Sequence, residues 1–432
     1  MSKNSLPNII YILSDDLGYG DLGCFGQEFI YTPNIDRIAA EGIRFTDHYA
    51  GSSVCAPSRC VLMTGLHTGH CYVRDNRALP IEGNVPIPGE TQTVAKLLKK
   101  GGYATACIGK WGLGYPGSEG DPNNQGFDHF FGYNCQREAH TYYPQHLWRN
   151  DQKIMLYGKS YSHDLLTAEA LQFVREQQSN PFFLYLAYTI PHTRFEIPSL
   201  DIYKDKPWTE NQKTQAAMIT RMDRDIGTLL DMLDALGIAE NTLVIFTSDN
   251  GPHGSGNTLG HFNAAGPLRA KKGSLYEGGI RVPFVARWPG TIQPGTVSAH
   301  YSGFQDMLPT FCELADTSIP EPVDGISMLP ALLDRDTQQA HEFLYWERRG
   351  VSAVRMGDWK GYLPEGHTNP EGVVELYDLA TDIGEQNDLA TEYPDIVSEI
   401  RTIVRKSHRN TPWETWEYDG PIPNEYGTVV HR

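Results

Sequence analysis

The sequence predicts an α/β domain with a large sheet between helices, followed by a small C-terminal α+β subdomain with an antiparallel sheet. From residue 8 onward, short apolar runs rich in β-branched residues alternate with amphipathic segments of helical period. Beyond the polar segment 334–340 the pattern changes to short strand-like runs and one helix. A chain of 432 residues also exceeds what one hydrophobic core usually serves, so we expect a boundary that divides it into 1–335 and 336–432.

The composition is that of an ordinary globular protein, with 40% hydrophobic and 21% charged residues. The formal net charge of -17 argues against a nucleic-acid partner or an anionic membrane surface. We find no apolar run long enough to span a bilayer. If the substrate is anionic, positive charge must therefore be concentrated locally at the site.

The cysteines do not settle the cellular compartment. The chain has 7 of them, an odd number, without Cys-x-x-Cys pairs, so they define neither a disulfide framework nor a zinc site. Residues 1–7 contain no apolar signal region. We expect a periplasmic or secreted protein whose signal has been removed, or a cytoplasmic one if this N-terminus is native.

Two predicted strands end in oxygen-bearing side chains. Residues 8–13 form a buried apolar run that leads to Asp15 and Asp16, and residues 241–247 lead to Asp249 and Asn250. The carboxyl ends of the strands form the functional edge of a doubly wound sheet. A hard divalent cation with oxygen ligands would relieve the repulsion between adjacent carboxylates. A solvated turn is the alternative for Asp-Asp alone, but two such strand ends favour a shared cation site.

The stretch from Cys55 to Gly65 holds a candidate nucleophile at the start of a helix. Pro57 and Ser58 are good helix-opening residues, and the free N–H groups of a helix N-terminus suit an anion. Arg59 adds a guanidinium four residues after the cysteine. Taken alone, the short motif favours an ordinary buried core residue at Cys55, because free cysteine is among the most buried residue types.

The remaining elements follow the same alternation. Lys110 follows a predicted strand at 104–108, and His192 follows another at 181–187, so both are expected at the functional edge. Residues 116–151 are predicted to be a long loop. Helices are expected at 32–42, 93–100, 162–177, 216–236 and 394–406, and C-terminal strands at 350–356 and 375–379.

Several motifs together resemble those of the type I sulfatases, a family of the alkaline-phosphatase-like superfamily. Cys55-x-Pro57-Ser58-Arg59 followed by Thr64-Gly65 resembles the family signature. Residues 109–114, Gly-Lys-Trp-Gly-Leu-Gly, resemble the family's Gly-Lys-Trp-His-Leu-Gly, and residues 266–283 match its Leu-Arg-x-x-Lys-Gly and Glu-Gly-Gly-x-Arg-x-Pro pattern. The resemblance extends over nearly the whole chain, and it implies an alkaline-phosphatase-like α/β sandwich that hydrolyses sulfuric esters.

The resemblance also implies roles for individual residues. A separate maturation enzyme would oxidise Cys55 to Cα-formylglycine, which acts as an aldehyde hydrate, and Arg59 would orient that hydrate. Lys110 and Lys272 would contact the sulfate, His192 would protonate the leaving alcohol, and Glu277 with Arg281 would hold the loop by an ion pair. The implied Ca²⁺ ligands are Asp15, Asp16, Asp249, Asn250 and an oxygen of modified Cys55.

One departure from the family motif concerns position 112, where glycine stands in place of histidine. His70 and His253 are candidates to fill that space. The segment 136–143 suits a sugar pocket, though it could equally pack on itself. We expect a sulfated carbohydrate substrate, with galactose-type units as the first guess. The candidate substrate-binding residues are His70, Arg77, Arg137, His140, His253 and His261.

The sequence is also compatible with two alternative functions. A phosphonate monoester or phosphodiester hydrolase of the same superfamily would share the Cys-x-Pro-x-Arg site. A non-catalytic sulfoglycan-binding protein is suggested by Gly112, although the presence of Arg59, both lysines and all the cation ligands argues against it.

Overall fold

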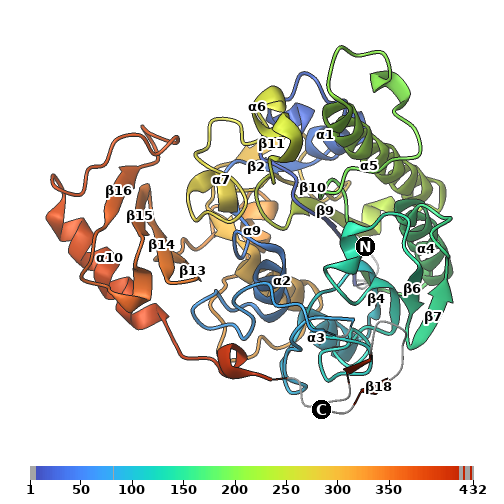
Figure 1. Cartoon of the computed structure of the whole chain (residues 1–432), viewed down its shortest axis with the longest axis horizontal. Helices are drawn as coiled ribbons and strands as arrows, with labels where there is room; N and C mark the ends of the chain where they lie inside the picture. Colours follow the sequence, from blue (N-terminus) through green and yellow to red (C-terminus); the bar gives the residue numbers. More distant parts are fainter. Residues whose placement is uncertain (1–5, 81, 418–421, 424–428, 431–432) are drawn as a thin grey trace.

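The computed structural model describes residues 6–80, 82–417, 422–423 and 429–430. In Figure 1 a large domain occupies the right and centre, and a smaller sheet with one helix lies at the left. Residues 1–5, on which part of the expectation about a signal region depends, lie outside the described residues.

The large domain is built on a 10-stranded mixed sheet with the order β11-β2-β10-β9-β1-β8-β4-β5-β6-β7. Its centre, from β9 to β5, is parallel, while β10 pairs antiparallel with β9, and β6 with both β5 and β7. The strands are β1 (Asn8–Ser14), β2 (Ile43–Phe45), β4 (Ala104–Lys110), β5 (His129–Tyr133), β6 (His146–Arg149), β7 (Gln152–Met155), β8 (Phe182–Ala187), β9 (Thr242–Ser248), β10 (Phe284–Arg287) and β11 (Thr296–Ser298).

Helices cover both faces of this sheet (Figure 1). One apolar core joins the sheet to α2, α3 and α8, and a second joins the opposite face to α1, α4 and α5. The helices of the chain are α1 (Pro33–Ala40), α2 (Cys55–Thr64), α3 (Val94–Lys100), α4 (Ser162–Gln177), α5 (Glu210–Ala235), α6 (Thr258–Phe262), α7 (Glu277–Ile280), α8 (Met307–Leu314), α9 (Leu329–Leu332) and α10 (Pro394–Ser407).

Strand β1 shows why the central runs are apolar throughout. Successive side chains of a strand point to opposite faces, and Tyr11 and Leu13 belong to one core while Ile10 and Ile12 belong to the other. A strand with helices on both faces needs apolar residues at every position. The predicted α/β class with a large mixed sheet is confirmed.

The C-terminal sheet is antiparallel and four-stranded, in the order β13-β14-β15-β16, and α10 packs on it. Its strands are β13 (Leu344–Arg348), β14 (Val351–Met356), β15 (Trp359–Leu363) and β16 (Glu375–Asp378). Two short pairs complete the assignment, β3 (His48–Tyr49) with β12 (Ser302–Gly303) and β17 (Ile422–Pro423) with β18 (Val429–Val430). The polar segment 334–340 lies between α9 and β13.

One prediction about local structure was wrong, and it does not concern α2. As expected, that helix begins at the candidate nucleophile Cys55, with Pro57 in the first turn, where its missing N–H is tolerated. Residues 116–151 are not one loop, because they contain β5 and β6. The run His-Phe-Phe-Gly-Tyr of β5 becomes a strand by pairing along β4, a long-range partner that local pattern does not reveal.

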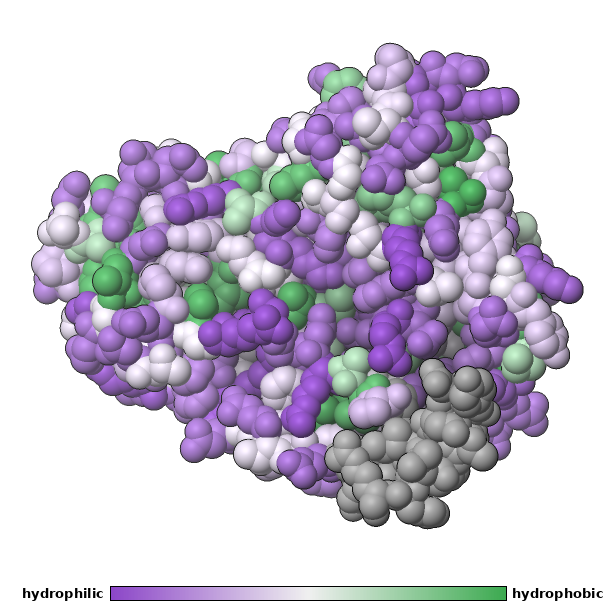
Figure 2. All heavy atoms as spheres, in the orientation of Figure 1, coloured by the Kyte–Doolittle hydropathy of each residue, from purple (hydrophilic) through white to green (hydrophobic). Residues whose placement is uncertain are grey.

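Hydrophilic residues dominate the face seen in Figure 2, and apolar residues appear there as separate small patches. Among the residues that the structure describes, no helix is both long and apolar enough to cross a membrane.

Candidate functional site

The parallel strands deliver the predicted polar residues to one edge of the sheet. β1 and β9 pair with Ser14 opposite Ser248, so the residues that follow, Asp15–Asp16 and Asp249–Asn250, emerge side by side. The Asp16 N–H donates to Asp249 Oδ1 at 3.2 Å. Asp16 has a φ of 67°, a left-handed conformation that aspartate tolerates better than most residues.

Three cations, of which Lys110 and Arg59 are buried and Lys272 is partly buried, face these carboxylates. Lys110, at the end of β4, places Nζ 2.6 Å from Asp15 Oδ2, with both side chains fully buried. Lys272 Nζ lies 2.7 Å from Asp16 Oδ1. Arg59 donates from Nε and Nη2 to Asp249 Oδ2 at 3.1 and 2.7 Å, and from Nη1 to the Lys110 carbonyl at 2.7 Å. This acidic chain therefore concentrates positive charge at the edge where the strands end.

The Lys272 loop is tied to both neighbouring parts of the site. The Lys272 N–H donates to the Pro252 carbonyl at 3.1 Å, just after β9. The Gly273 N–H donates to the Ser53 carbonyl at 2.8 Å, just before α2. Glu277 and Arg281 form the expected ion pair at 3.3 Å, and Glu277 also pairs with Lys360 at 2.7 Å.

Cys55 is the first residue of α2 and is 1% exposed. Its Sγ donates to Asp15 Oδ1 at 3.4 Å. Burial, together with the negative charge of Asp15, raises the pKa of the Cys55 thiol to about 12. A thiol with that pKa is protonated at neutral pH, so Cys55 as it stands is not a thiolate nucleophile.

Asn76, which is not among the residues predicted from the sequence, helps to hold the start of α2. Its Oδ1 accepts a hydrogen bond of 2.9 Å from the Ala56 N–H, one of the N–H groups without a partner inside the helix. The only sequence signal was a polar Asp-Asn pair after the signature helix. Such pairs are common in loops, and local pattern could not connect this one to Cys55.

His192 lies in the same cluster, on the segment that follows β8. Its Nε2 lies 3.3 Å from Asp16 Oδ2 and 3.0 Å from Lys272 Nζ. Tyr142 supports this segment, because its hydroxyl donates to the carbonyls of Thr189 and His192 at 2.9 and 2.5 Å. Burial lowers the pKa of His192, and the nearby carboxylates only partly oppose that effect.

Asp15 and Asp249 differ in their electrostatics. Burial alone would raise the pKa of Asp15, but Lys110, His192 and Arg59 together hold it well below its usual range. Burial and the charge of Asp15 raise the pKa of Asp249 to about 6, despite the contact with Arg59. Crowded carboxylates of this kind call for additional positive charge.

The residues present fit a hard divalent cation. Ligand atoms of Asp15, Asp16, Cys55 and His192 all lie within 4.8 Å of one another. The buried Oδ1 of Asn250 has no hydrogen-bond partner among the residues that the structure describes, while its Nδ2 donates to Asp16 Oδ1 at 2.8 Å. An amide oxygen left over beside three carboxylates matches the all-oxygen ligand set that Ca²⁺ prefers.

Of the six candidate substrate-binding residues, His140 and His253 lie beside His192, Arg137 is close to His140 in the chain, and the remaining three make other contacts. His140 and His253 lie at the cluster, with ring centroids 3.6 and 5.9 Å from that of His192. Arg137 forms an ion pair of 3.6 Å with Glu138, two residues before His140, and its side chain is 57% exposed. The other three, His70, Arg77 and His261, make contacts of a different kind.

His70 does not fill the space beside Gly112. Its Nδ1 lies 2.8 Å from Asp324 Oδ1, and its ring stacks on His67 at 4.1 Å. Arg77 donates to the Trp413 carbonyl at 2.8 Å and so holds the C-terminal segment. His261 packs between Phe29 and Trp208 at 5.8 and 5.2 Å.

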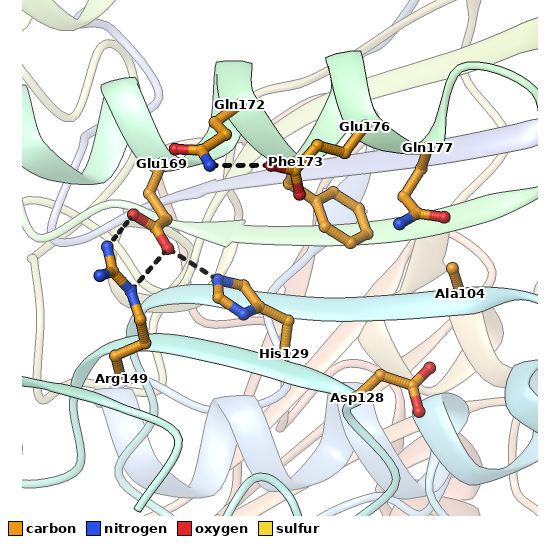
Figure 3. Close-up of a pocket in the computed structure, with 9 residues that line it drawn as sticks. All are labelled: Ala104, Asp128, His129, Arg149, Glu169, Gln172, Phe173, Glu176 and Gln177. Carbon is orange, nitrogen blue, oxygen red and sulfur yellow. Dashed lines mark hydrogen bonds and ion pairs between the residues drawn. The ribbon is translucent and has the colours of Figure 1, made fainter. Parts of the chain in front are cut away.

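A cavity of about 410 Å³ lies at the opposite edge of the sheet (Figure 3). It is lined by Ala104 and His129, the first residues of the parallel strands β4 and β5, whereas Lys110 is the last residue of β4. Glu169 of α4 binds Arg149 and His129 there, and the Glu169–His129 distance is 2.9 Å. This cavity is therefore separate from the cluster around Cys55.

The chain matches two family models. One is described as "Sulfatase" and matches residues 7–317, and the other as "N-sulphoglucosamine sulphohydrolase, C-terminal" and matches residues 270–410. Arylsulfatase A of Homo sapiens is 33% identical, over 92% of this chain and 87% of that protein. N-acetylgalactosamine-6-sulfatase of Homo sapiens is 31% identical, over 93% and 85%. The crystal structure of Ps i-CgsB in complex with k-i-k-neocarrahexaose is 30% identical, with a TM-score of 0.80 and 93% of each chain covered.

Proposed function

Because this chain belongs to the sulfatase family and is a sulfuric ester hydrolase, we propose that it removes sulfate from a sulfated sugar with Cys55, converted to Cα-formylglycine, as its nucleophile. One observation carries this proposal. Cys55 begins α2 at the point where Asp15, Asp16, Lys110, Lys272 and His192 converge, at the carboxyl edge of the sheet.

Two groups complete the proposed site. Formylglycine supplies a hydrated aldehyde, which is the nucleophile that a protonated, buried thiol is not. Ca²⁺ supplies charge neutralisation for the sulfate and the nucleophile. Asp15, Asp16, Asp249, Asn250 and the modified residue 55 would hold the cation. A separate maturation enzyme is then a required partner.

The remaining residues neutralise charge and move a proton. Lys110 and Lys272 stabilise the sulfate oxygens, where negative charge is present in the ester and in the transition state. Arg59, which is anchored on Asp249, orients residue 55. His192 lies 3.0 Å from Lys272 and is the proposed proton donor to the departing alcohol.

The proposed substrate class is a galactose-type sulfated sugar. Relatives named N-acetylgalactosamine-6-sulfatase, and the relative solved with k-i-k-neocarrahexaose, support a carbohydrate substrate, while the relative named arylsulfatase A keeps a small aryl ester as the alternative to be tested. A sulfated polysaccharide is encountered outside the cytoplasm, so we propose a periplasmic or secreted location.

The test is release of inorganic sulfate from a panel of sulfated monosaccharides and oligosaccharides, with aryl sulfates and phosphate diesters in parallel. The protein is co-expressed with a formylglycine-generating enzyme, and Cys55→Ala is the control. We expect sulfate from at least one galactose-type sugar. Efficient turnover of aryl sulfates alone would contradict the sugar assignment, and turnover of phosphate diesters alone would contradict the sulfatase mechanism.

A further inference from the structure

The space in front of Gly112 is already filled in this protein. A Cβ atom at position 112 would lie 2.4 Å from Nε2 and 2.5 Å from Cγ of Gln136, closer than atoms can approach without one of them moving. Gly112 also has a φ of 87°, in the region that favours glycine. Position 112 therefore cannot bring a side chain into the site without displacing Gln136.

Gln136 reaches this place because β4 and β5 are parallel neighbours whose following segments continue side by side. The Trp111 N–H donates to the Tyr133 carbonyl at 3.0 Å, and the Gly112 N–H donates to the Asn134 carbonyl at 3.3 Å. The Gln136 side chain is 4% exposed, and its Nε2 has no partner within the described part of the chain. The segment after β5 thus takes the position that a side chain after β4 would otherwise occupy.

The same segment brings His140 into the site. After Gln136 the chain forms a short 3-10 helix (Glu138–His140), and the His140 ring stacks on His192 with 3.6 Å between centroids and 8° between planes. The Nε2 atom of His140 is buried and has no hydrogen-bond partner among the residues described here. In contrast, His192 Nε2 is near Lys272 and Asp16, and His192 Nδ1 contacts the Thr193 carbonyl.

A buried imidazole nitrogen without a partner is costly unless a ligand satisfies it. Burial, together with the positive charge of Lys110, lowers the pKa of His140, so its ring is neutral. A neutral imidazole can donate one hydrogen bond and accept another. A sulfate ester offers oxygen acceptors at the place where Lys110, Lys272 and His192 converge.

We infer that His140 contacts the sulfate ester through its unpartnered Nε2. Gln136 fills the space beside Gly112, so the imidazole at this place is supplied by the segment after β5 and not by residue 112. The inference rests on the proposed function, since it assigns a further substrate-contacting residue to the same site. It replaces His70 and His253 as the candidates for the space beside Gly112.

The test distinguishes two roles of His140, hydrogen bonding by Nε2 and stacking of the ring on His192. His140→Phe keeps an aromatic ring to stack on His192 but removes Nε2, whereas His140→Gln keeps a hydrogen-bond donor and loses the ring. Both are made in Cys55→Ala protein, which lacks the proposed nucleophile and should bind substrate without turning it over. The probes are inorganic sulfate and a 6-sulfated galactose, and affinity is measured by isothermal titration calorimetry in the presence of Ca²⁺.

We expect His140→Phe to weaken binding of the sulfated sugar by about tenfold or more, as for loss of a hydrogen bond to a charged group, and His140→Gln to weaken it less. His129→Phe, at the opposite edge of the sheet, should leave the affinity unchanged. Thermal unfolding of each variant confirms that it is folded.

Equal affinity of His140→Phe and its Cys55→Ala parent would overturn the inference, because the ring would then serve packing alone. If the parent binds neither sulfate nor any sulfated sugar, the proposed function itself falls, and the inference with it. In the active enzyme, His140→Phe should reduce kcat/KM while His129→Phe does not.

A second experiment tests whether the Gln136 side chain occupies the space beside Gly112. Gly112→Ala should destabilise the protein and reduce sugar binding, and the further change Gln136→Gly should restore part of the loss by removing the atoms that clash. Strictly additive effects of the two substitutions on stability would show that Gln136 does not occupy that space.

Discussion

At the scale of single residues, the hydrogen bonding of Asn250 indicates a cation site. Its Nδ2 is satisfied by Asp16 and by the Gly251 carbonyl, yet its buried Oδ1 has no partner among the described residues. Buried polar atoms are normally hydrogen-bonded. Beside Asp15, Asp16 and Asp249, this oxygen would complete the ligand set of the proposed Ca²⁺ site.

Calcium should therefore stabilise the folded protein. Adding Ca²⁺ after chelation should raise the Tm of the wild type by several degrees, since a ligand that binds only the native state stabilises it. In Asn250→Leu the increase should be much smaller, whereas Asn180→Leu, an exposed position, should keep the full increase. A wild-type Tm that is the same with Ca²⁺ and with chelator would contradict the site.

At the scale of elements, the start of α2 sets the position of residue 55. The helix begins at Cys55 itself, so the backbone there is fixed by helix geometry and by what holds the first turn. Its N-cap, Val54, makes no side-chain capping bond, and Asn76 instead accepts a hydrogen bond from the Ala56 N–H. A loop residue 20 positions away in sequence thus replaces the usual cap.

Asn76→Leu should destabilise this helix start. We expect a loss of about 1 kcal/mol in the free energy of unfolding, typical of a removed cap, together with a fall in kcat because residue 55 is less firmly placed. Urea denaturation and sulfate release measure the two effects. Asn76→Asp keeps an oxygen acceptor and should retain stability; if it loses as much as Asn76→Leu, the hydrogen bond to Ala56 is not the reason.

The elements that could be predicted from sequence are those whose signals are local. The apolar runs of β1 and β9 end in Asp-Asp and Asp-Asn, and parallel pairing alone brings these residues to one edge. The strand β5 and the approach of His140 to His192 could not be predicted, because both depend on which strand lies beside β4. The same applies to Gln136, whose contact with Gly112 crosses between segments that follow two different strands.

At the scale of the whole molecule, the C-terminal sheet supports loops of the proposed active site. Lys360 of β15 places Nζ 2.7 Å from Glu277 Oε1, with both side chains fully buried, and Glu277 lies five residues after Lys272. The Trp346 indole of β13 donates to the Ala50 carbonyl at 2.9 Å, shortly before α2. The smaller sheet therefore contacts two of the segments from which the site is built.

Lys360→Met should damage both stability and the site. Of the two ion pairs of Glu277 described above, only the longer one, of 3.3 Å with Arg281, then remains, so we expect a cost of up to roughly 3–5 kcal/mol in the free energy of unfolding, the range for breaking a buried pair. We expect KM to rise as well, because Glu277 helps to fix the Lys272 loop. Adding Glu277→Gln should recover part of the stability; a double variant less stable than Lys360→Met would show that the charge on Glu277 is not the cause.

A second contact at this junction should depend on pH. Burial opposes protonation of His341, but Asp306 lies 2.9 Å away and raises the pKa of His341 above its usual value. The stability that this ion pair contributes is therefore fully present below the pKa of a histidine in the unfolded chain, about 6.5. It is lost as the pH rises through the higher pKa of His341 in the folded protein. His341→Gln should destabilise the protein more at pH 6 than at pH 9, as measured by urea denaturation. Equal losses at both pH values would contradict the charged pair.

The central claim is that Cys55 acts only after conversion to formylglycine. Mass spectrometry of the tryptic peptide from Phe45 to Arg59, taken from a preparation that releases sulfate from a sulfated sugar, tests it most directly. We predict the mass of formylglycine at residue 55, in a fraction that rises with specific activity across preparations. An active preparation in which this peptide carries only unmodified cysteine would contradict the account.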